Sequence, residues 1–247
     1  MTDTAKTQSA KAVCVVGATG GIGAATCRLF AAQGWRMVLM DLATSPLKDL
    51  AVELRGTAHA LDMADAASVE AAFAAARQET AQLDALVVAS GVVEPATALT
   101  QVTDEAWARM LAINLTGVFM CCRAAVDWLR DGGRIVTLSS NAARSGGLAT
   151  GPAYAASKGG VEALTKAMAN QLAPRRITVN AVAPGATDTP MLDAHPPERI
   201  AAIAKMTPLG RIATPEHVAA AIAFLASDGA AHMTGVVLPV NGGQRMD

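Results

Sequence analysis

The 247-residue sequence predicts one α/β domain, a doubly wound parallel sheet flanked by helices. Three observations lead to this prediction. Short apolar runs that end in glycine, aspartate or serine alternate with helical patterns, which is typical of parallel strands joined by helical crossovers. Hydrophobic residues make up 52% of the chain and aromatic residues only 3%, which suits Ala-rich helices on a buried aliphatic sheet. No linker or repeat divides residues 11–247, and residues 1–10 are expected to be a disordered or flexible N-terminal segment.

The first elements form a strand–helix–strand unit. The apolar strand Lys11–Val16 runs directly into the glycine-rich turn Gly17–Gly23, followed by a helix over Ala24–Gln33 and a strand over Arg36–Asp41. Glycines allow the backbone to approach a pyrophosphate, and the helix N-terminus supplies unpaired N–H groups and a positive dipole end. This unit predicts a dinucleotide site.

Asp41 gives the expected cofactor preference. It lies eighteen residues after Gly23, where a carboxylate accepts hydrogen bonds from the adenosine ribose hydroxyls. A carboxylate there repels a 2′-phosphate, and no Arg or Lys occurs in the glycine turn or just after Asp41. The sequence therefore favours NAD over NADP. A plain turn followed by a solvent-facing aspartate is the alternative interpretation.

The alternation continues through the middle of the chain. Helices are predicted at Ser45–Leu54, at Ala66–Thr80, from an N-cap at Thr103 to about Leu129, and at Pro152–Leu172. Strands are predicted at Thr57–Leu61, Ala85–Ala89, Arg134–Leu138 and Thr178–Val182. Ligands on such sheets bind beyond the carboxyl ends of the strands. The residues expected along that edge are Gly17, Asp41, Asp62, Gly91, Ser140 and Pro184.

The alternation of strands and helices stops at residues 186–212. This stretch holds four prolines and one short helical pattern, Glu198–Lys205, and a connection of this length in a compact domain is typical of a functional lid. A helix then begins at Thr214-Pro215-Glu216 and runs to about Ser227. Val236–Val240 is the last predicted strand.

Tyr154 is the only tyrosine in the chain, and Lys158 follows it by four residues. On a helix this spacing places both side chains on one face, about one turn apart. A neighbouring ammonium favours the phenolate, so a hydroxyl of ordinary pKa ~10 becomes a candidate proton acceptor near neutral pH. Taken alone, such a pair is more often a core tyrosine followed by a surface lysine, and the rest of the chain has to decide between the two interpretations.

Composition excludes several other classes of protein. A formal charge of −1 and a pI near 6.4 give no electrostatic basis for binding nucleic acid or an anionic membrane. No apolar run reaches the ~18 residues of a membrane span, and the apolar run after Lys11 is too short for a signal peptide. The four cysteines contain no C-x-x-C pair, so the sequence predicts neither a metal site nor disulfides. It predicts a cytoplasmic location, where cysteines stay reduced.

These motifs together resemble the classical short-chain dehydrogenases/reductases, over about Lys11–Gly243. Those in family order and spacing are the loop Gly17–Gly23, Asp62-Met63, Asn114 within Ile113–Gly117, Ser140, Tyr154-x-x-x-Lys158, Pro184-Gly185, Leu209–Arg211, Phe224–Asp228 and Val240–Gly243. The resemblance implies a Rossmann-like fold, an NAD-binding catalytic domain, and interconversion of a secondary alcohol and a ketone by hydride transfer.

The resemblance also implies roles for individual residues. Tyr154 is the expected general acid/base and Ser140 the hydroxyl that holds the substrate oxygen. Lys158 is expected to bind the nicotinamide ribose, and Asn114 to support a water in a proton relay. The implied cofactor-binding residues are Gly17, Thr19, Gly21, Ile22, Gly23, Asp41, Asp62, Met63, Ala89, Gly91, Tyr154, Lys158, Pro184, Thr187 and Thr189. Simpler roles stay open for Ser140 as a polar strand end, Asn114 as a buried amide and Asp62 as a helix cap.

Several features depart from the family pattern or leave alternatives. The usual Asn-Asn-Ala-Gly is Val88–Gly91 here, Val16 replaces a threonine, and Gly20 replaces a polar loop residue. The alternatives are an NADP-dependent carbonyl or oxoacyl reductase and a non-catalytic NAD-sensing protein. An enoyl reductase normally spaces its tyrosine and lysine more widely.

Two further expectations concern the substrate and the assembly. The substrate is a small-molecule alcohol or ketone whose identity the sequence does not give, and an anion could be bound by Arg144, His195 and Arg199. Behind Tyr154, the helix carries a face of small residues: Ala156, Gly159, Gly160, Ala163 and Ala167. Because interior glycines weaken a helix, close packing by another backbone is the expected compensation. With the resemblance, this face predicts a homotetramer, or at least a homodimer.

Overall fold

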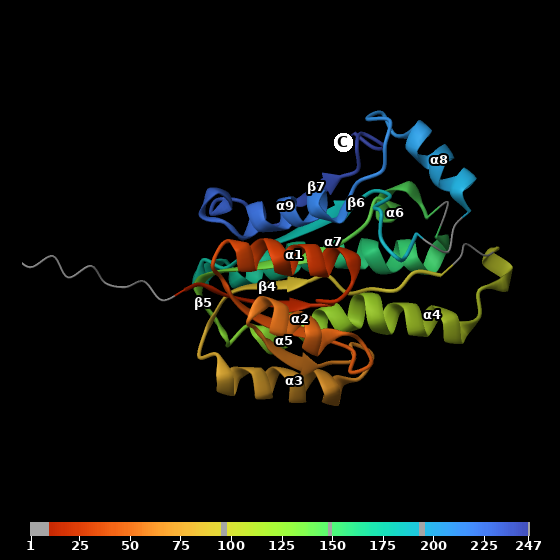
Figure 1. The fold of residues 1–247 in the computed structure, drawn as a ribbon. Coiled ribbons are helices and arrows are strands. Elements are labelled where there is room, and N and C mark those ends of the chain that lie inside the picture. Colours follow the sequence, from red (N-terminus) through yellow and green to blue (C-terminus); the bar gives the residue numbers. More distant parts are fainter. Residues whose placement is uncertain (1–9, 95–97, 148–149, 193–195, 247) are drawn as a thin grey trace, which may run out of the picture.

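Seven parallel strands form one sheet in the order β3-β2-β1-β4-β5-β6-β7 (Figure 1). The computed structural model describes residues 10–94, 98–147, 150–192 and 196–246, so most of the predicted N-terminal segment lies outside it. The strands are β1 (Ala12–Val16), β2 (Arg36–Asp41), β3 (Thr57–Ala60), β4 (Leu83–Val88), β5 (Leu129–Leu138), β6 (Thr178–Pro184) and β7 (Val237–Val240). The chain winds outward from β1 to β3, returns to β4 beside β1, and continues the other way. The predicted doubly wound sheet is confirmed, and its switch point lies between β1 and β4.

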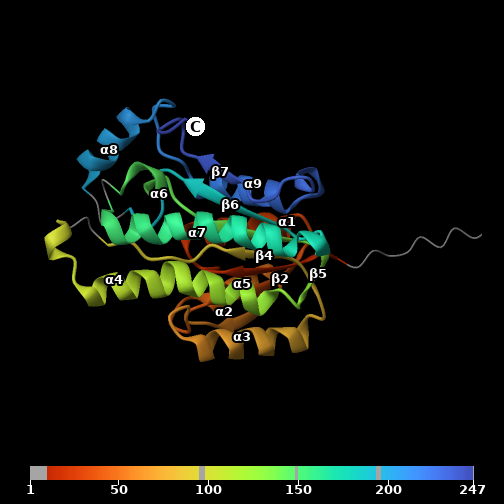
Figure 2. The same ribbon diagram turned by 180° about the vertical axis from the view of Figure 1, so that it is seen from behind.

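Helices cover both faces of the sheet. They are α1 (Gly21–Ala32), α2 (Leu47–Leu54), α3 (Ala66–Glu79), α4 (Asp104–Leu111), α5 (Val118–Ala125), α6 (Ala142–Ser145), α7 (Gly151–Leu172), α8 (Pro197–Met206) and α9 (Pro215–Ala226). Helices α1, α2 and α9 cover one face, and α3, α5 and α7 the other (Figures 1 and 2). Strand β1 shows why, since Val13 and Val15 pack into one core and Cys14 and Val16 into the other.

The prediction of a long helix from Thr103 to about Leu129 is wrong at its C-terminal end. Helix α5 ends at Ala125, and Leu129 begins β5 by pairing with Leu83 before the register shifts. The side chains of this stretch suit a helix, so the pairing with β4 decides its structure. The helix also contains a π-helical segment, Ala112–Gly117, which a 3.6-residue pattern does not reveal.

The adjacent glycines Gly159 and Gly160 of α7 have different surroundings. A Cβ at Gly160 would lie 2.7 Å from Leu115 of the π-helical segment, so this glycine allows close packing within the chain itself. A Cβ at Gly159 would meet nothing within 4 Å. The expectation that both glycines face a partner subunit is therefore wrong for Gly160.

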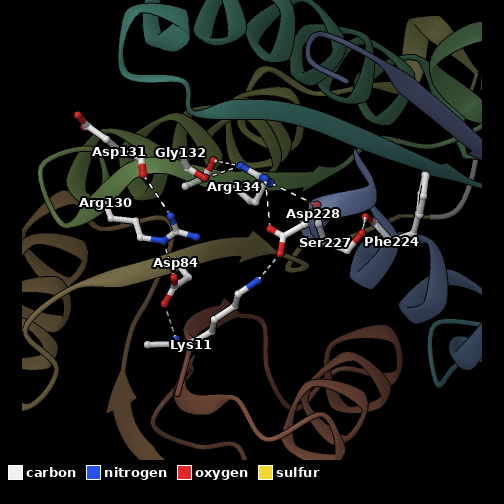
Figure 3. A network of polar contacts seen from close by, with 11 residues as sticks. Lys11, Asp84, Arg130, Asp131, Gly132, Arg134, Phe224, Ser227 and Asp228 are labelled. Atoms are coloured by element: carbon white, nitrogen blue, oxygen red, sulfur yellow. Dashed lines mark hydrogen bonds and ion pairs between the residues drawn. The ribbon is translucent and has the colours of Figure 1, made fainter. Parts of the chain in front are cut away.

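Charged side chains hold the amino-terminal edge of the sheet together (Figure 3). Arg134 is buried, donates to the Gly133 carbonyl at 3.2 Å and lies 3.8 Å from Asp228, which also pairs with Lys11 at 3.1 Å. Asp84 accepts from the Ala12 N–H at 2.8 Å and pairs with Arg130. These contacts join β1, β4, β5 and the end of α9 on the side opposite the strand carboxyl ends. Within the described ranges, no helix is long and apolar enough to cross a membrane.

The predicted lid leaves the sheet after β6. It contains α8, and Thr187 forms an isolated bridge with Ala213, so the two ends of the segment lie side by side. His195 lies outside the described residues.

Candidate active site

A cavity of about 350 Å³ lies beyond the carboxyl ends of the strands. Ser140, two residues beyond the end of β5, lines it, and so do Tyr154 and Lys158 of α7. Ile22, Ala89, Gly91, Pro184, Thr187 and Thr189 complete its inner wall. The structure therefore brings together predicted residues that are up to 167 positions apart, from Ile22 to Thr189.

Tyr154 and Lys158 lie one helical turn apart, as expected. The Lys158 Nζ is 5.9 Å from the centre of the Tyr154 ring and donates to the Leu138 carbonyl at 2.9 Å. Burial raises the pKa of Tyr154, and the hydrogen bond with Ser140 offsets part of this effect. Burial lowers the pKa of Lys158 to about 8. The net shift of the Tyr154 pKa is therefore upward because the phenolate is desolvated, and the contribution that lowers it comes from Ser140 and not, as expected, from the lysine.

The buried ammonium has a consequence for stability. Because the pKa of Lys158 falls from 10.5 to about 8 on folding, the unfolded state binds more protons between these pH values. We expect Lys158→Met to raise the free energy of unfolding at pH 7 by on the order of 1–3 kcal/mol, while removing activity. Urea unfolding of both proteins should show this difference shrinking from pH 8 to pH 10.5. A variant less stable than wild type at pH 7 would contradict the expectation.

Asn114 lies in the π-helical segment and is fully buried. Its amide exchanges two hydrogen bonds of 2.8 Å with the backbone of Val92. A Cβ at Gly91 would lie 3.2 Å from both Asn114 Oδ1 and Lys158 Nζ, so a side chain there would fill the gap between them. The side chain of Asn114 therefore braces the segment after β4, next to the lysine.

The glycine turn packs so closely on its own backbone that Gly17 and Gly23 leave no room for a side chain. Gly17 has φ of +79°, and a Cβ there would lie 2.6 Å from the backbone of Ser90. A Cβ at Gly23 would lie 1.9 Å from the Gly17 carbonyl oxygen. No side chain caps α1, whose N-cap is Gly20, so its first N–H groups are left for a ligand.

Asp41 is held against this turn. Its Oδ2 accepts hydrogen bonds from the Thr19 N–H at 2.8 Å and the Thr19 hydroxyl at 2.6 Å. The Leu42 N–H donates to Oδ1 at 2.8 Å. The carboxylate therefore lies at the carboxyl end of β2, beside the turn, where the sequence places the adenosine ribose.

The remaining predicted cofactor residues lie along the same edge. A Cβ at Gly21 would lie 2.7 Å from Thr189 Cγ2, so the turn and the lid are in close contact. Asp62 is exposed beyond β3 and accepts from the Ala64 N–H at 2.8 Å. The cap of α3 is Asp65, so the alternative role of Asp62 as that cap is wrong. Met63 is buried in the core, so its side chain does not face the edge.

Arg144 is engaged by a buried carboxylate. Its Nε lies 3.0 Å from Glu162 Oε2, and the Ser139 hydroxyl donates to Glu162 Oε1 at 3.0 Å. This cluster joins the segment around Ser140 to α7. Arg199 is exposed on α8 and does not line the cavity. Neither arginine therefore supports the expected binding of an anionic substrate.

Two residues near the site were missed by the sequence analysis: Glu162 anchors Arg144, and Gln244 lines the cavity from the C-terminal segment. Ser90, within the segment Val88–Gly91 that departs from the family pattern, also lines the cavity. Gln244 directly follows the motif Val240–Gly243, which was a usable signal. Nothing in the sequence marks Glu162.

The described residues include neither a candidate metal site nor an exposed cysteine. No group of three or more His, Cys, Asp or Glu in these ranges could hold a metal ion. All four cysteines are free and buried, and burial raises the pKa of each thiol.

A parallel sheet with a glycine turn, and with serine, tyrosine and lysine gathered at its carboxyl edge, defines a nicotinamide-dependent oxidoreductase. A family model described as enoyl-(acyl carrier protein) reductase matches residues 17–245. The chain belongs to the short-chain dehydrogenase/reductase family.

Individual relatives are similar to this chain over nearly their whole length. A cis-4-hydroxycyclohexanecarboxylate dehydrogenase of Sinomonas cyclohexanicum is 42% identical, over 93% of this chain and 94% of the relative. The crystal structure of a short-chain dehydrogenase/reductase from Brucella melitensis, titled glucose/ribitol dehydrogenase, has a TM-score of 0.91 at 36% identity, with 96% and 97% of the two chains covered. A 3-ketoacyl-(acyl-carrier-protein) reductase from the same organism, complexed with NADH, has a TM-score of 0.88 at 30% identity, with 96% and 98% covered.

Proposed function

We propose that this protein is an NAD-dependent oxidoreductase that interconverts a secondary alcohol and a ketone. The observation that carries the proposal is the common cavity lined by Ser140, Tyr154 and Lys158. Asp41, held beside the glycine turn, supports NAD over NADP. The buried, free cysteines accord with a reducing compartment, and we place the protein in the cytoplasm.

In the proposed mechanism the chain positions the substrate and moves one proton. Ser140 and Tyr154 hydrogen-bond the reacting oxygen, whose charge changes during the reaction. In oxidation, the phenolate of Tyr154 takes the hydroxyl proton; in reduction, the phenol returns it. Lys158 supplies positive charge beside the phenol, and Asn114 braces the adjoining segment. The glycine turn, Asp41 and Lys158 would hold the nicotinamide cofactor, which would supply the hydride acceptor or donor when bound.

Two other functions remain as alternatives. An NADP-dependent oxoacyl reductase is favoured by the 3-ketoacyl reductase relative, although that structure is a complex with NADH. A non-catalytic NAD sensor would retain the glycine turn without needing Tyr154 and Lys158. The four-residue spacing of that pair does not suit an enoyl reductase, despite the description of the matching family model.

A panel of secondary alcohols and ketones, each assayed with NAD(H) and NADP(H), tests the proposal. We expect turnover with NAD(H) for at least one alcohol–ketone pair. Tight NAD binding without turnover of any compound would favour the sensor. Turnover that requires NADP(H) would favour the reductase.

We further propose that the protein is a homotetramer, or at least a homodimer, assembled on α7 and on α5, which belongs to the long helix predicted before it. Ala156, Ala163 and Ala167 of α7 are exposed, the space beside Gly159 is open, and Phe119 of α5 is 41% exposed. Apolar and small residues on adjoining helices favour close packing of a second copy.

A charge placed on this face tests the assembly. We expect light scattering at micromolar concentration to show an oligomer for the wild type and a smaller species for Ala163→Arg, because an unpaired guanidinium would be buried. Ala74→Arg, on the exposed face of α3, is the matched control and should leave the size unchanged. A monomeric wild type would contradict the proposal.

A further inference from the structure

Much of the active-site cavity is apolar. Besides the reacting centre and polar residues such as Gln244, its lining includes Val93 after β4 and Met191, Leu192, Ile203 and Met206 of the lid. Met191 is 46% exposed and Met206 73% exposed, although large hydrophobic side chains are normally buried. Methionine adapts its shape to an apolar partner, so these two side chains suit the role of covering one.

Among the described residues that line this cavity, none offers a free positive charge to an anionic substrate. Lys158 is the one charged side chain among its described lining residues, and its ammonium donates to the Leu138 carbonyl beside Tyr154. The nearby Arg144 lies against the Glu162 carboxylate at 3.0 Å, which offsets its charge. A carboxylate entering this cavity would lose hydration without gaining a free cationic partner among the described lining residues.

We propose, on the basis of the function proposed above, that the site accepts uncharged ketones and alcohols whose apolar body packs beneath Met191 and Met206. Carboxylates and phosphates of the same skeleton are poor substrates. This specificity narrows the choice among the alcohols and ketones that the catalytic residues alone would accept.

Matched pairs of ketones test the inference. The wild type with NADH is assayed on 4-oxopentanoate against its methyl ester, and on 5-oxohexanoate against its ethyl ester. We expect kcat/KM to be at least about tenfold higher for each ester, mainly through KM. In the series from 2-butanone to 2-octanone, kcat/KM should rise with chain length as more apolar surface is buried. Equal or greater activity on the carboxylates, or no rise along the series, overturns the inference.

Lysine substitutions in the lid show whether these methionines face the substrate. Met191→Lys and Met206→Lys should each lower the ester-to-carboxylate ratio of kcat/KM at least about tenfold. Leu209→Lys adds the same charge at an exposed lid position outside the cavity lining and should leave the ratio unchanged. An ester preference that survives both methionine substitutions overturns the placement of the substrate body. If the wild type reduces no ketone at all, the proposed function fails, whereas a preference for carboxylates defeats only the substrate class.

Discussion

Replacement of Tyr154 by phenylalanine is expected to lower kcat by about 10³-fold or more while leaving NADH affinity within about twofold. The phenol is the group in the cavity that is placed to exchange a proton with the substrate oxygen, and general acid–base catalysis contributes about 10²–10⁴-fold. The substitution also removes the hydrogen bond with Ser140, so the loss should fall at the upper end of that range.

Steady-state assays and NADH fluorescence titration measure the two effects separately. Ser140→Ala serves as the companion variant, since it removes one hydrogen bond to the reacting oxygen but leaves the proton-transfer group. We expect it to retain more activity than Tyr154→Phe. If Tyr154→Phe kept a tenth or more of the wild-type kcat, the assignment of the general acid/base would be wrong.

The single tyrosine also allows its ionisation to be followed directly. Tyrosinate absorbance in the folded protein reports Tyr154 alone, because the chain contains no other tyrosine. Burial raises its pKa, so we expect the protein without cofactor to titrate above pH 10. A bound NAD⁺ adds a positive charge to the site and should lower that value. An unchanged titration with and without NAD⁺ would mean that the cofactor does not bind near the phenol.

Local signals in the sequence predicted the features of this protein that depend on neighbouring residues. The glycine turn, Asp41 at the end of β2, and the spacing of Tyr154 and Lys158 each express a requirement of backbone geometry or helix periodicity. The parallel sheet then brings strand ends to one edge whatever the details of the helices. Ser140 and Gly91 could therefore be placed beside α7 without any knowledge of their contacts.

Features that depend on distant contacts were not predictable in the same way. The start of β5 at Leu129 is determined by its pairing with Leu83, and the Gly160 position by packing on Leu115. The contact between Arg144 and Glu162 joins two helices, so neither residue carries a signal of its own. The pKa of Tyr154 depends on burial as well as on the lysine, and burial cannot be read from a four-residue spacing.

Removal of the Asp41 carboxylate is expected to change the choice of cofactor. We expect wild-type kcat/KM to be at least about a hundredfold higher with NAD⁺ than with NADP⁺, because the carboxylate would lie against a 2′-phosphate. In Asp41→Ala the ratio should fall about tenfold or more, and Leu42→Arg added to it should favour NADP⁺ further by pairing with the phosphate. Leu42 is 48% exposed, so an arginine there has room to reach a ligand.

The ratio of the two cofactors is the informative quantity. Asp41 also accepts two hydrogen bonds from Thr19, so its loss should loosen the glycine turn and weaken both cofactors together. Only the loss of repulsion acts on NADP⁺ alone. Asp49→Ala, which removes an exposed carboxylate from α2, is the matched control and should leave the ratio unchanged, since the charge of an exposed side chain is screened by solvent and salt. If Asp41→Ala lowers both values of kcat/KM equally, the carboxylate organises the turn without selecting the cofactor, and the preference for NAD has to arise elsewhere in the site.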